Sequence, residues 1–473
     1  MKRQKSGSSS HPPAMRRPTL SFTAGLGPVL ILSLFFLLVL WAAGGASRAD
    51  VMGQVVVRGA AWAALCLLAL FAPHPMIGSH RPVTIFLILA LALALAQIVP
   101  LPPAIWQALP GRAMLSDAAA ITGEAQPWRP LAIVPDAAVN AAGSLVVPFA
   151  MLALLICMRE AEQRWMPGLL LSLIAASTLL GLLQFSGSRF NNPLINDTVG
   201  QISASFANRN HLALFLAIGC VLAPVWAVRS RRGAQWRMVA ALGMMVLFIL
   251  MILATGSRAG LLLCGLALVM ASTLVWNDVR RELRRYPRWV LPTVGAMVVG
   301  MLTIVVLSSF AANRAVSINR VFASGVGQDM RGQALPTVME MIQAYFPIGS
   351  GLGSFDPIFR IYEPYGLLKL TYFNHAHNDL LEVVLDAGLP GALLLLTAIG
   401  WWGVASFWAW RRGAEAMLAR LGSAIIGLML IASLFDYPVR TPMIMAVLVI
   451  AAWWLSSPAS DGAATLRHKG AYL

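Results

Sequence analysis

The sequence is short of charged residues and of cysteine. Only 11% of its 473 residues are charged and four are cysteine, whereas 58% are hydrophobic. A chain with so little charge falls far outside the range of soluble globular proteins and indicates a multi-span membrane protein. Cysteines occur at Cys66, Cys157, Cys220 and Cys264, all in or beside apolar stretches. No CxxC pair is present, so the cysteines indicate no disulfide framework.

The chain also lacks the alternating apolar and polar pattern of barrel strands. Long apolar runs take its place, and many exceed the roughly 18 residues that cross a ~30 Å hydrocarbon core. These runs predict an all-α, polytopic membrane helix bundle of about twelve transmembrane helices. The candidate spans are 22–43, 55–72, 83–100, 139–158, 166–186, 210–228, 237–254, 259–276, 289–308, 389–410, 417–434 and 441–457.

Negative charge is the scarcer sign, with 19 Asp and Glu against 35 Lys and Arg. Basic runs follow the sixth, eighth and tenth spans, so the positive-inside rule predicts cytoplasmic tails at 1–21 and 458–473. No basic stripe is interleaved with aromatic residues, which argues against a nucleic-acid partner. The first span is longer than the apolar region of a typical signal peptide, which predicts a retained anchor. Residues 46–49 (ASRA) leave cleavage as the alternative.

The predicted organisation is a transmembrane bundle of about nine spans at 22–308, a large exofacial loop at 309–388, and three C-terminal transmembrane helices at 389–457. Within the loop, the pattern from Arg331 to Tyr345 predicts a short amphipathic helix. A glycine-rich run at 349–353 follows it. This run follows no strand and faces outside, so a tight turn explains it better than a nucleotide loop does.

The end of the loop reads FNHAHNDLLEVVLDAGLPG, from Phe373 to Gly391. On a helix, His375, Asp379, Glu382 and Asp386 form one polar stripe at i, i+4, i+7 and i+11. The GLPG sequence at 388–391 is expected to end this short helix and to turn the chain into the tenth span. The helix is therefore predicted to lie at the exofacial membrane surface.

His375 and His377 allow three interpretations. A neutral imidazole can take a proton from a hydroxyl, and a carboxylate one turn away can orient it. Asp379 lies one helical turn beyond His375, whereas His377 needs a partner from elsewhere or a non-helical start. A zinc site requires further donors that the exofacial loops hardly offer. Purely structural capping is the third interpretation, and periodicity alone does not choose between the two histidines.

Arg258 lies in a turn of a few residues between two apolar spans. A cation at membrane-surface depth is costly and is a functional hypothesis by default. Ser257 can cap the following helix, whose free N–H groups add positive potential, so the pair predicts a phosphate or diphosphate site. The alternative is an arginine that extends toward lipid headgroups.

The stretch from Asn208 to His211 brings polar groups abruptly into the sixth span. Asn208 and Asn210 are candidates to bind sugar hydroxyls, and Arg209 to bind a phosphate. Helix capping with an interfacial cation is the alternative. For Arg331, a solvated helix start or a pairing with a neighbouring aspartate is the alternative to phosphate binding. Together these groups suggest displacement of a diphosphate by a hydroxyl, with arginines neutralising the leaving group and an imidazole as base.

Several of these motifs resemble those of one family. His377-Asn378, nine residues, and Gly388-x-x-Gly391 are similar to the signature of the O-antigen ligases. The TGSR sequence ending at Arg258 resembles the exofacial arginine motif of that superfamily, which includes the Wzy-type polysaccharide polymerases. Residues 347–355 resemble the segment before the catalytic loop, and Arg331 takes about the place of a second arginine. The likeness covers roughly residues 200–457.

The resemblance implies a GT-C-like glycosyltransferase of the bacterial inner membrane with a periplasmic active site. It implies an undecaprenyl-diphosphate-linked glycan as donor, an acceptor glycan (lipid A-core or a lipid-linked repeat), and no metal or other cofactor. It places the catalytic histidine on His377 and the diphosphate-binding arginines on Arg258 and Arg331. The expected substrate-binding residues are Arg209, Asn208, Asn210, His375, Asn378, Asp379 and Glu382. One departure is Leu335-Pro336, where many members carry a tryptophan.

Two other functions are compatible with the sequence. A twelve-span secondary transporter would place polar groups at mid-membrane within two related halves. This chain shows no such repeat, and its polar groups gather on one side of the predicted bundle. A ligase that glycosylates a protein side chain would share the donor and differ only in the acceptor.

Overall fold

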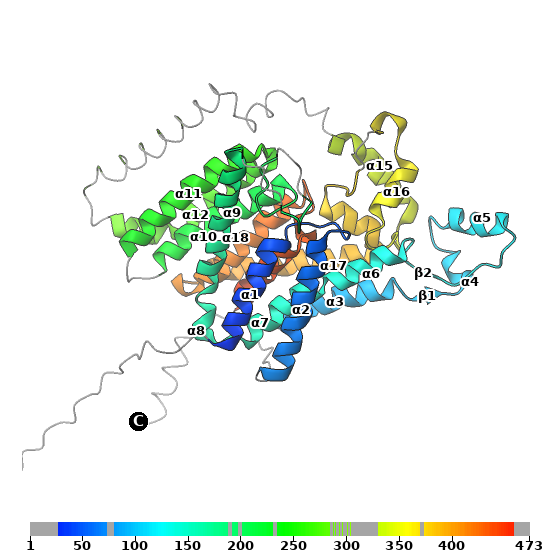
Figure 1. The fold of residues 1–473 in the computed structure, drawn as a ribbon, viewed down its shortest axis with the longest axis horizontal. Helices are drawn as coiled ribbons and strands as arrows, with labels where there is room; N and C mark the ends of the chain where they lie inside the picture. The colour runs from blue at the N-terminus through cyan, green and yellow to red at the C-terminus, as the bar shows by residue number, and fades with distance from the viewer. Residues whose placement is uncertain are drawn as a thin grey trace, which may run out of the picture.

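The computed structural model describes residues 27–72, 80–187, 192–196, 201–229, 234–283, 330–368 and 373–457, with a few single residues between 284 and 329. The regular elements of the described chain are helices and one two-stranded sheet (Figure 1). Its helices are α1 (Pro28–Ala43), α2 (Met52–Phe71), α3 (Arg81–Ala96), α4 (Pro103–Trp106), α5 (Ala113–Ile121), α6 (Pro135–Ser144), α7 (Val146–Cys157), α8 (Glu160–Gln163), α9 (Met166–Phe185), α10 (Arg209–Val228), α11 (Ala234–Thr255), α12 (Arg258–Leu283), α15 (Met330–Tyr345), α16 (Phe355–Tyr362), α17 (Asp379–Arg411), α18 (Met417–Ala432) and α19 (Pro442–Ser456). The 3-10 turns are η3 (Tyr365–Leu367), η4 (Ala414–Ala416) and η5 (Pro438–Arg440). Strands β1 (Pro100–Leu101) and β2 (Arg129–Pro130) pair antiparallel.

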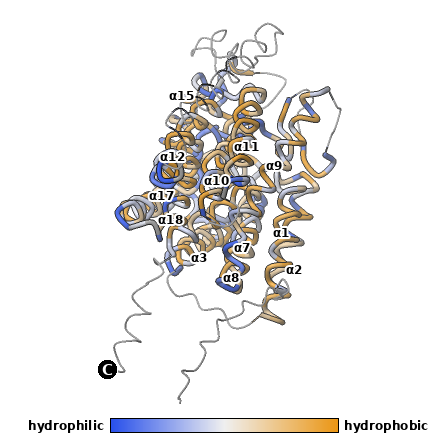
Figure 2. Tube along the Cα trace, turned by 90° about the vertical axis from the view of Figure 1, so that its left-hand side faces the viewer, coloured by the Kyte–Doolittle hydropathy of each residue, from blue (hydrophilic) through white to orange (hydrophobic). Residues whose placement is uncertain are grey.

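Apolar helices form the bulk of the molecule, as the sequence predicts. Seven described helices are long and apolar enough to cross a membrane, and four shorter apolar helices accompany them. Hydrophobic residues run along these helices (Figure 2), and the chain is an all-α, multi-pass membrane protein. The expected ninth span, 289–308, and both predicted tails lie largely or wholly outside the described residues. The total of twelve spans stays a prediction.

Helix α10 lies at the centre of the bundle. It packs against α9, α11, α12 and α18, and 83% of its 18-residue apolar stretch is buried inside the protein. Leu212, Phe215 and Ile218 are fully buried there, within one large hydrophobic core shared with the surrounding helices. A helix that is apolar on every side is stable only when other helices surround it or when lipid does. The N-terminus of this central helix therefore has a fixed position in the molecule.

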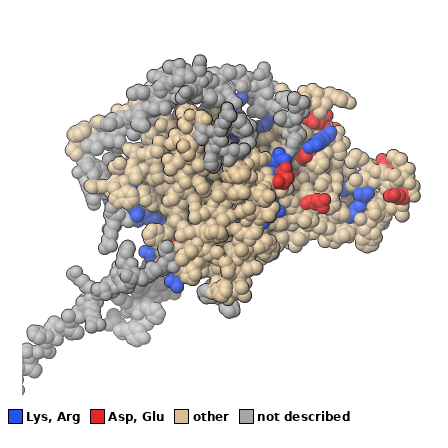
Figure 3. Space-filling model, viewed as in Figure 1, with Lys and Arg blue, Asp and Glu red and all other residues tan. Residues whose placement is uncertain are grey.

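A smaller lobe stands beside one end of the bundle. Helices α15 and α16 cover the start of α17 and enclose a separate core that includes Met341, Phe355 and Phe359. The β1–β2 pair and helices α4 and α5 extend outward next to this lobe (Figure 1). Acidic and basic side chains gather over this side of the molecule and leave the middle of the same face nearly free of charge (Figure 3).

The glycine-rich run at 349–353 packs directly against a break in α17. The break is at Gly388, whose φ of 57° and ψ of −146° are not helical. A Cβ on Gly388 would lie 2.2 Å from the carbonyl oxygen of Pro347, and one on Gly349 would lie 2.7 Å from the Gly388 nitrogen. Leu389 donates its N–H to the same Pro347 oxygen at 2.7 Å. The glycines thus allow two backbones to touch, which agrees with the tight turn predicted and fixes the direction of the first turns of α17.

Two details of the predicted loop helix differ in the structure. The helix begins at Asp379, so His375 precedes it and does not belong to its polar stripe. The reason is Asn378, whose side-chain oxygen accepts the N–H groups of Leu380 and Leu381 at 3.1 Å each and so caps the first turn. The predicted change of direction occurs at Gly388 alone, because Pro390 and Gly391 already belong to the continuing helix. The predicted helix from Arg331 to Tyr345 is confirmed as α15.

Candidate functional site

A polar cavity of about 480 Å³ opens where five distant parts of the chain meet. These parts are the α1–α2 loop, the segment before α10 with the start of that helix, the start of α15, the loop that precedes α17, and the loop between α18 and α19. Its lining residues are Gly45, Ser47, Arg48, Asn196, Gln201, Ala207, Asn208, Arg209, Asn210, His211, Arg331, Asn374, His377 and Tyr437. Five of the predicted site residues therefore line one cavity: His377, Arg331, Arg209, Asn208 and Asn210.

The charges at this cavity are of one sign. Three arginines, Arg48, Arg209 and Arg331, are among the described residues that line it, and no aspartate or glutamate is. Amide and hydroxyl side chains make up most of the remaining polar wall. Guanidinium groups bind phosphate oxygens strongly, and a cavity lined by one sign of charge attracts the opposite one. The cavity therefore suits an anionic ligand that also carries hydroxyl groups.

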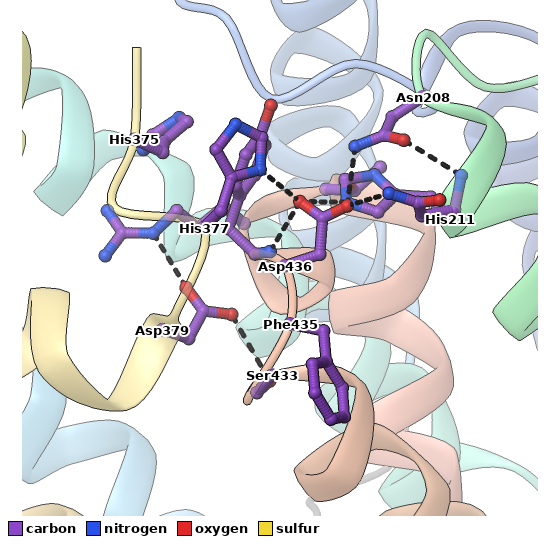
Figure 4. A network of polar contacts seen from close by, with 12 residues as sticks. Asn208, His211, His375, His377, Asp379, Ser433, Phe435 and Asp436 are labelled. Atoms are coloured by element: carbon purple, nitrogen blue, oxygen red, sulfur yellow. Dashed lines mark hydrogen bonds and ion pairs between the residues drawn. The ribbon is translucent and has the colours of Figure 1, made fainter. Parts of the chain in front are cut away.

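His377 forms a pair with Asp436, a residue 59 positions later in the chain. Its Nδ1 lies 3.1 Å from Asp436 Oδ1 (Figure 4). Asp436 lies in the loop between α18 and α19, and its side chain is 4% exposed. An ionised carboxylate can only accept, so Nδ1 carries the proton and Nε2 of the neutral ring is a free acceptor. The pair has the geometry of a general base with an orienting carboxylate.

Asp436 is held in its ionised form by several neighbours. Its Oδ2 accepts amide hydrogens from Asn208 at 3.0 Å and Asn210 at 2.5 Å. Arg331 Nη2 lies 3.6 Å from the same oxygen, and Arg331 Nη1 donates to the carbonyl oxygen of Phe435 at 2.7 Å. Burial acts to raise the pKa of Asp436, but the hydrogen bond from His377 and the charges nearby outweigh it. The pKa of Asp436 is therefore held well below its ordinary value.

His377 adopts an unusual backbone conformation. Its φ is +50°, in the left-handed region that residues with a side chain seldom occupy. The following residue, Asn378, is in an extended conformation and caps α17. Strained conformations persist only where the surroundings impose them, and they cluster at functional sites. In this conformation the imidazole of His377 contacts Asp436.

His375 has a different partner from the one that the sequence predicts. Its Nδ1 lies 2.8 Å from Glu382 Oε1, and the expected pairing with Asp379 is wrong because His375 precedes the helix. Glu382 is fully buried, and its other oxygen accepts the N–H of Ala376 at 2.8 Å. His375 is not one of the described residues that line the cavity. The pair instead fixes the loop that carries His377.

Arg440 neutralises the carboxylates at the start of α17. Its guanidinium lies 2.9 Å from Asp379, 3.1 Å from Glu382 and 3.7 Å from Asp386. Burial acts to lower the pKa of Arg440, but the three carboxylates outweigh burial and hold this pKa above its ordinary value. Asp379 also accepts a hydrogen bond from the Ser433 hydroxyl at 3.3 Å (Figure 4). The polar stripe predicted for this helix thus faces Arg440 and the interior.

Tyr437 contacts three histidines of the site. Its ring centroid lies 4.1 Å from that of His375, 5.0 Å from that of His377 and 5.3 Å from that of His211. His211 is buried beneath the cavity, with Nδ1 3.0 Å from the Thr441 hydroxyl and Nε2 3.9 Å from Asp436 Oδ1. The faces of aromatic rings attract cations, so Tyr437 suits an imidazole that becomes protonated during a reaction.

Arg258 does not line the cavity, although the sequence predicts that it binds substrate there. It is the exposed first residue of α12, next to Ser257. Ser257 caps this helix as expected, accepting the N–H of Gly260 at 2.8 Å. The Ser257 hydroxyl also donates to Asn210 Oδ1 at 2.8 Å and so joins this helix to the cavity wall. A role for Arg258 in binding substrate stays a prediction.

Asn208 illustrates how two interpretations can hold together. Its side-chain oxygen accepts the N–H of Asn210 and caps α10, as the capping alternative predicts. Its side-chain nitrogen meanwhile donates to Asp436. Binding of sugar by Asn208 and Asn210 stays a prediction. Among the described residues, no group of three or more His, Cys, Asp or Glu side chains is arranged to hold a metal ion.

Sequence reasoning missed Asp436, Tyr437, Arg440 and Arg48. The first three lie in SLFDYPVRT (433–441), a short polar turn between two apolar spans. The argument that singled out Arg258, the cost of an ion at the membrane surface, applies equally to this turn and could have found them. Arg48 carries no comparable signal, because the sequence marks residues 46–49 only as a possible cleavage site.

Fold and site together define a multi-pass helical membrane protein with a cationic, hydroxyl-compatible cavity and a histidine–aspartate pair at its edge. Residues 243–396 match the model of a family described as O-antigen ligase. This match covers less than half of the chain and confirms the resemblance predicted from its motifs. The match contains Arg258, Arg331 and His377, whereas Asp436 and the start of α10 lie outside it. None of the curated proteins matches the chain.

Proposed function

We propose that the protein is a glycosyltransferase that moves a glycan from an undecaprenyl-diphosphate donor to a hydroxyl of an acceptor sugar. The observation that carries this proposal is the His377–Asp436 pair at the edge of a cavity lined by three arginines. The O-antigen ligase domain supports the same class of reaction. We further propose a bacterial inner-membrane location with the cavity on the periplasmic side, and a GT-C-like architecture.

His377 acts as the general base in this proposal. Its Nε2 takes the proton of the acceptor hydroxyl as the hydroxyl oxygen attacks the anomeric carbon of the donor sugar. Asp436 fixes the tautomer and the direction of the ring and stabilises the imidazolium that forms. The proton leaves His377 through the open cavity after transfer. Tyr437 faces the same ring and favours its charged form.

The leaving group is the lipid diphosphate. The bond between the anomeric carbon and the phosphate oxygen breaks, and negative charge grows on that oxygen. Arg331 and Arg209 line the cavity and neutralise this charge. Arg258 is proposed to act on the same diphosphate from the start of α12. No nucleotide or metal enters these steps.

The amide groups around the cavity are proposed to bind sugar. Asn196, Gln201 and Asn374 line it and can donate to or accept from hydroxyl groups. Asn208 and Asn210 contribute by orienting Asp436, in addition to the sugar contacts predicted for them. The acceptor is a glycan, either lipid A-core or a lipid-linked repeat.

A deletion strain tests the proposal. Loss of the gene product should abolish long surface polysaccharide, and a plasmid with the wild-type chain should restore it. His377→Ala should fail to restore the polysaccharide although it reaches the membrane in wild-type amount. Unchanged surface polysaccharide in the deletion strain would contradict the proposed function.

The same strain separates ligase from polymerase. A ligase deletion leaves long glycan on the lipid carrier, because polymerisation continues without transfer to lipid A-core. A polymerase deletion leaves single repeats on the carrier. Electrophoresis of the lipid-linked fraction distinguishes the two products.

A further inference from the structure

The α1–α2 loop forms one wall of the cavity and is held there by backbone contacts. The Gly45 carbonyl oxygen accepts the N–H of Ala207 at 3.0 Å, and the Gly44 carbonyl oxygen accepts the N–H of Met443 at 3.0 Å. A Cβ on Gly45 would lie 1.7 Å from the Ser205 carbonyl oxygen, so only glycine allows this approach. The loop therefore docks against the segment before α10 and against the start of α19.

Arg48 is the charged residue that this docked loop presents at the cavity. Gln54, which is 4% exposed, donates from Nε2 to the Ala46 carbonyl oxygen at 2.7 Å and fixes the loop from its other side. Asp50 receives two hydrogen bonds from the Arg48 guanidinium, one of them from Nε at 2.9 Å. The two side chains are 40% and 62% exposed. An exposed pair of this kind contributes little to fold stability, which leaves its orienting effect as the main consequence.

Arg48 adds a positive charge to the cavity from a different part of the chain than the other two arginines do. Arg209 comes from the start of α10 and Arg331 from the start of α15, so Arg48 adds a third guanidinium from a third part of the chain. The donor diphosphate is a diester with two negative charges, but the lipid diphosphate that leaves is a monoester with up to three, which is more than two guanidinium groups neutralise. Arg48 also lies far outside the matched residues 243–396.

We propose that Arg48 is a phosphate-binding residue that completes the site for the donor's diphosphate. This inference rests on the proposed function, because it takes the lipid diphosphate as the ligand. Asp50 is the positioning residue, because it holds the Arg48 guanidinium through two hydrogen bonds. A phospholipid headgroup offers the same phosphate chemistry, so the experiment must separate the two sources.

The test measures binding of farnesyl diphosphate to the full-length protein in nanodiscs of phosphatidylcholine. Arg48→Gln should raise the Kd by about tenfold or more, the loss expected for one charge-assisted contact. Arg48→Lys should recover part of the affinity, because it keeps the charge and loses the fork. Arg360→Gln is the matched control: it breaks an exposed Arg–Asp pair with Asp356, away from the cavity, and should leave the Kd unchanged.

Each outcome decides the inference. A Kd for Arg48→Gln within twofold of wild type would overturn it while leaving the proposed function intact. Wild-type protein that does not bind farnesyl diphosphate would contradict both. A second arm repeats the titration in nanodiscs with phosphatidylglycerol. If Arg48→Gln loses only its association with phosphatidylglycerol, Arg48 binds a lipid headgroup and the assignment to the donor is wrong.

Discussion

His375 and His377 lie two residues apart in the same loop, and each contacts a carboxylate. The two pairs have the same chemical groups but differ in their position relative to the cavity and in the neighbours of the carboxylate. His377 and Asp436 meet at 3.1 Å at the edge of the cavity. His375 and Glu382 meet at 2.8 Å, and neither is among the described residues that line the cavity. A close imidazole–carboxylate contact is therefore not enough to identify a base.

The surroundings of the two carboxylates explain the difference. Asp436 is bound mainly by neutral amides, with Arg331 at 3.6 Å, so its charge remains available to His377. Glu382 shares its charge with Arg440 at 3.1 Å and with the N–H of Ala376. The first pair is arranged to polarise an imidazole, and the second is arranged to hold a loop.

The largest effect, on the rate of glycan transfer, is expected when each of the two histidines is replaced separately. His377→Gln should lower the rate of glycan transfer by about 10²–10⁴-fold, the usual contribution of a general base. His375→Gln should cost less than about tenfold, because it only loosens the loop. Transfer in membrane vesicles with lipid-linked donor measures both. Equal losses for the two variants would remove the distinction between the pairs.

Arg440→Met tests the structural pair. It leaves three carboxylates at the start of α17 without their cation, which should lower the free energy of unfolding by about 3–5 kcal/mol. Asp386→Asn in the same chain should recover part of the loss, since the Oδ1 atom of Asp386 has no hydrogen-bond partner among the described residues. Unfolding in mixed micelles measures this change. Arg360→Met, in an exposed pair, is the control and should cost at most about 1 kcal/mol.

Asp436→Asn tests the catalytic pair from its other side. The amide keeps the shape of the carboxylate but no longer fixes the tautomer of His377, so kcat should fall by about 10–100-fold. The KM for the donor should change little, because Arg209 and Arg331 remain. Glu382→Gln is the matched variant in the other pair and should affect stability more than kcat. A reversed result would exchange the roles that we assign to the two carboxylates.

The smallest effect concerns acid stability. Because the folded-state pKa of Asp436 is lowered, its contribution to stability is present above the unfolded pKa of about 3.9 and is lost as pH falls below that value. The melting temperature of wild type should therefore fall more between about pH 5 and pH 3 than that of Asp436→Asn. Thermal unfolding in nanodiscs at several pH values measures the difference. Parallel curves for the two proteins would contradict the ionised state of Asp436 in the fold.

The sequence by itself determined the helical membrane architecture, the α15 helix, and the family to which residues 243–396 match. These features depend on apolar runs, helical periodicity and short motifs, all of which are local along the chain. The same local reasoning placed His375 inside this helix, although it precedes the helix, and paired it with Asp379. It could not foresee that Asn378 would cap the helix and exclude His375 from it.

Only the tertiary structure decided which histidine has an available carboxylate and which arginines share a cavity. Asp436 reaches His377 across 59 residues, and Arg48, near the start of the sequence, lines the same cavity as Arg331. Such partners come together because helix packing and close glycine contacts bring distant loops to one point, and no period in the sequence encodes that meeting. The residue types in the loop indicated its chemistry. The role of each residue depended on the side chains that the fold places beside it.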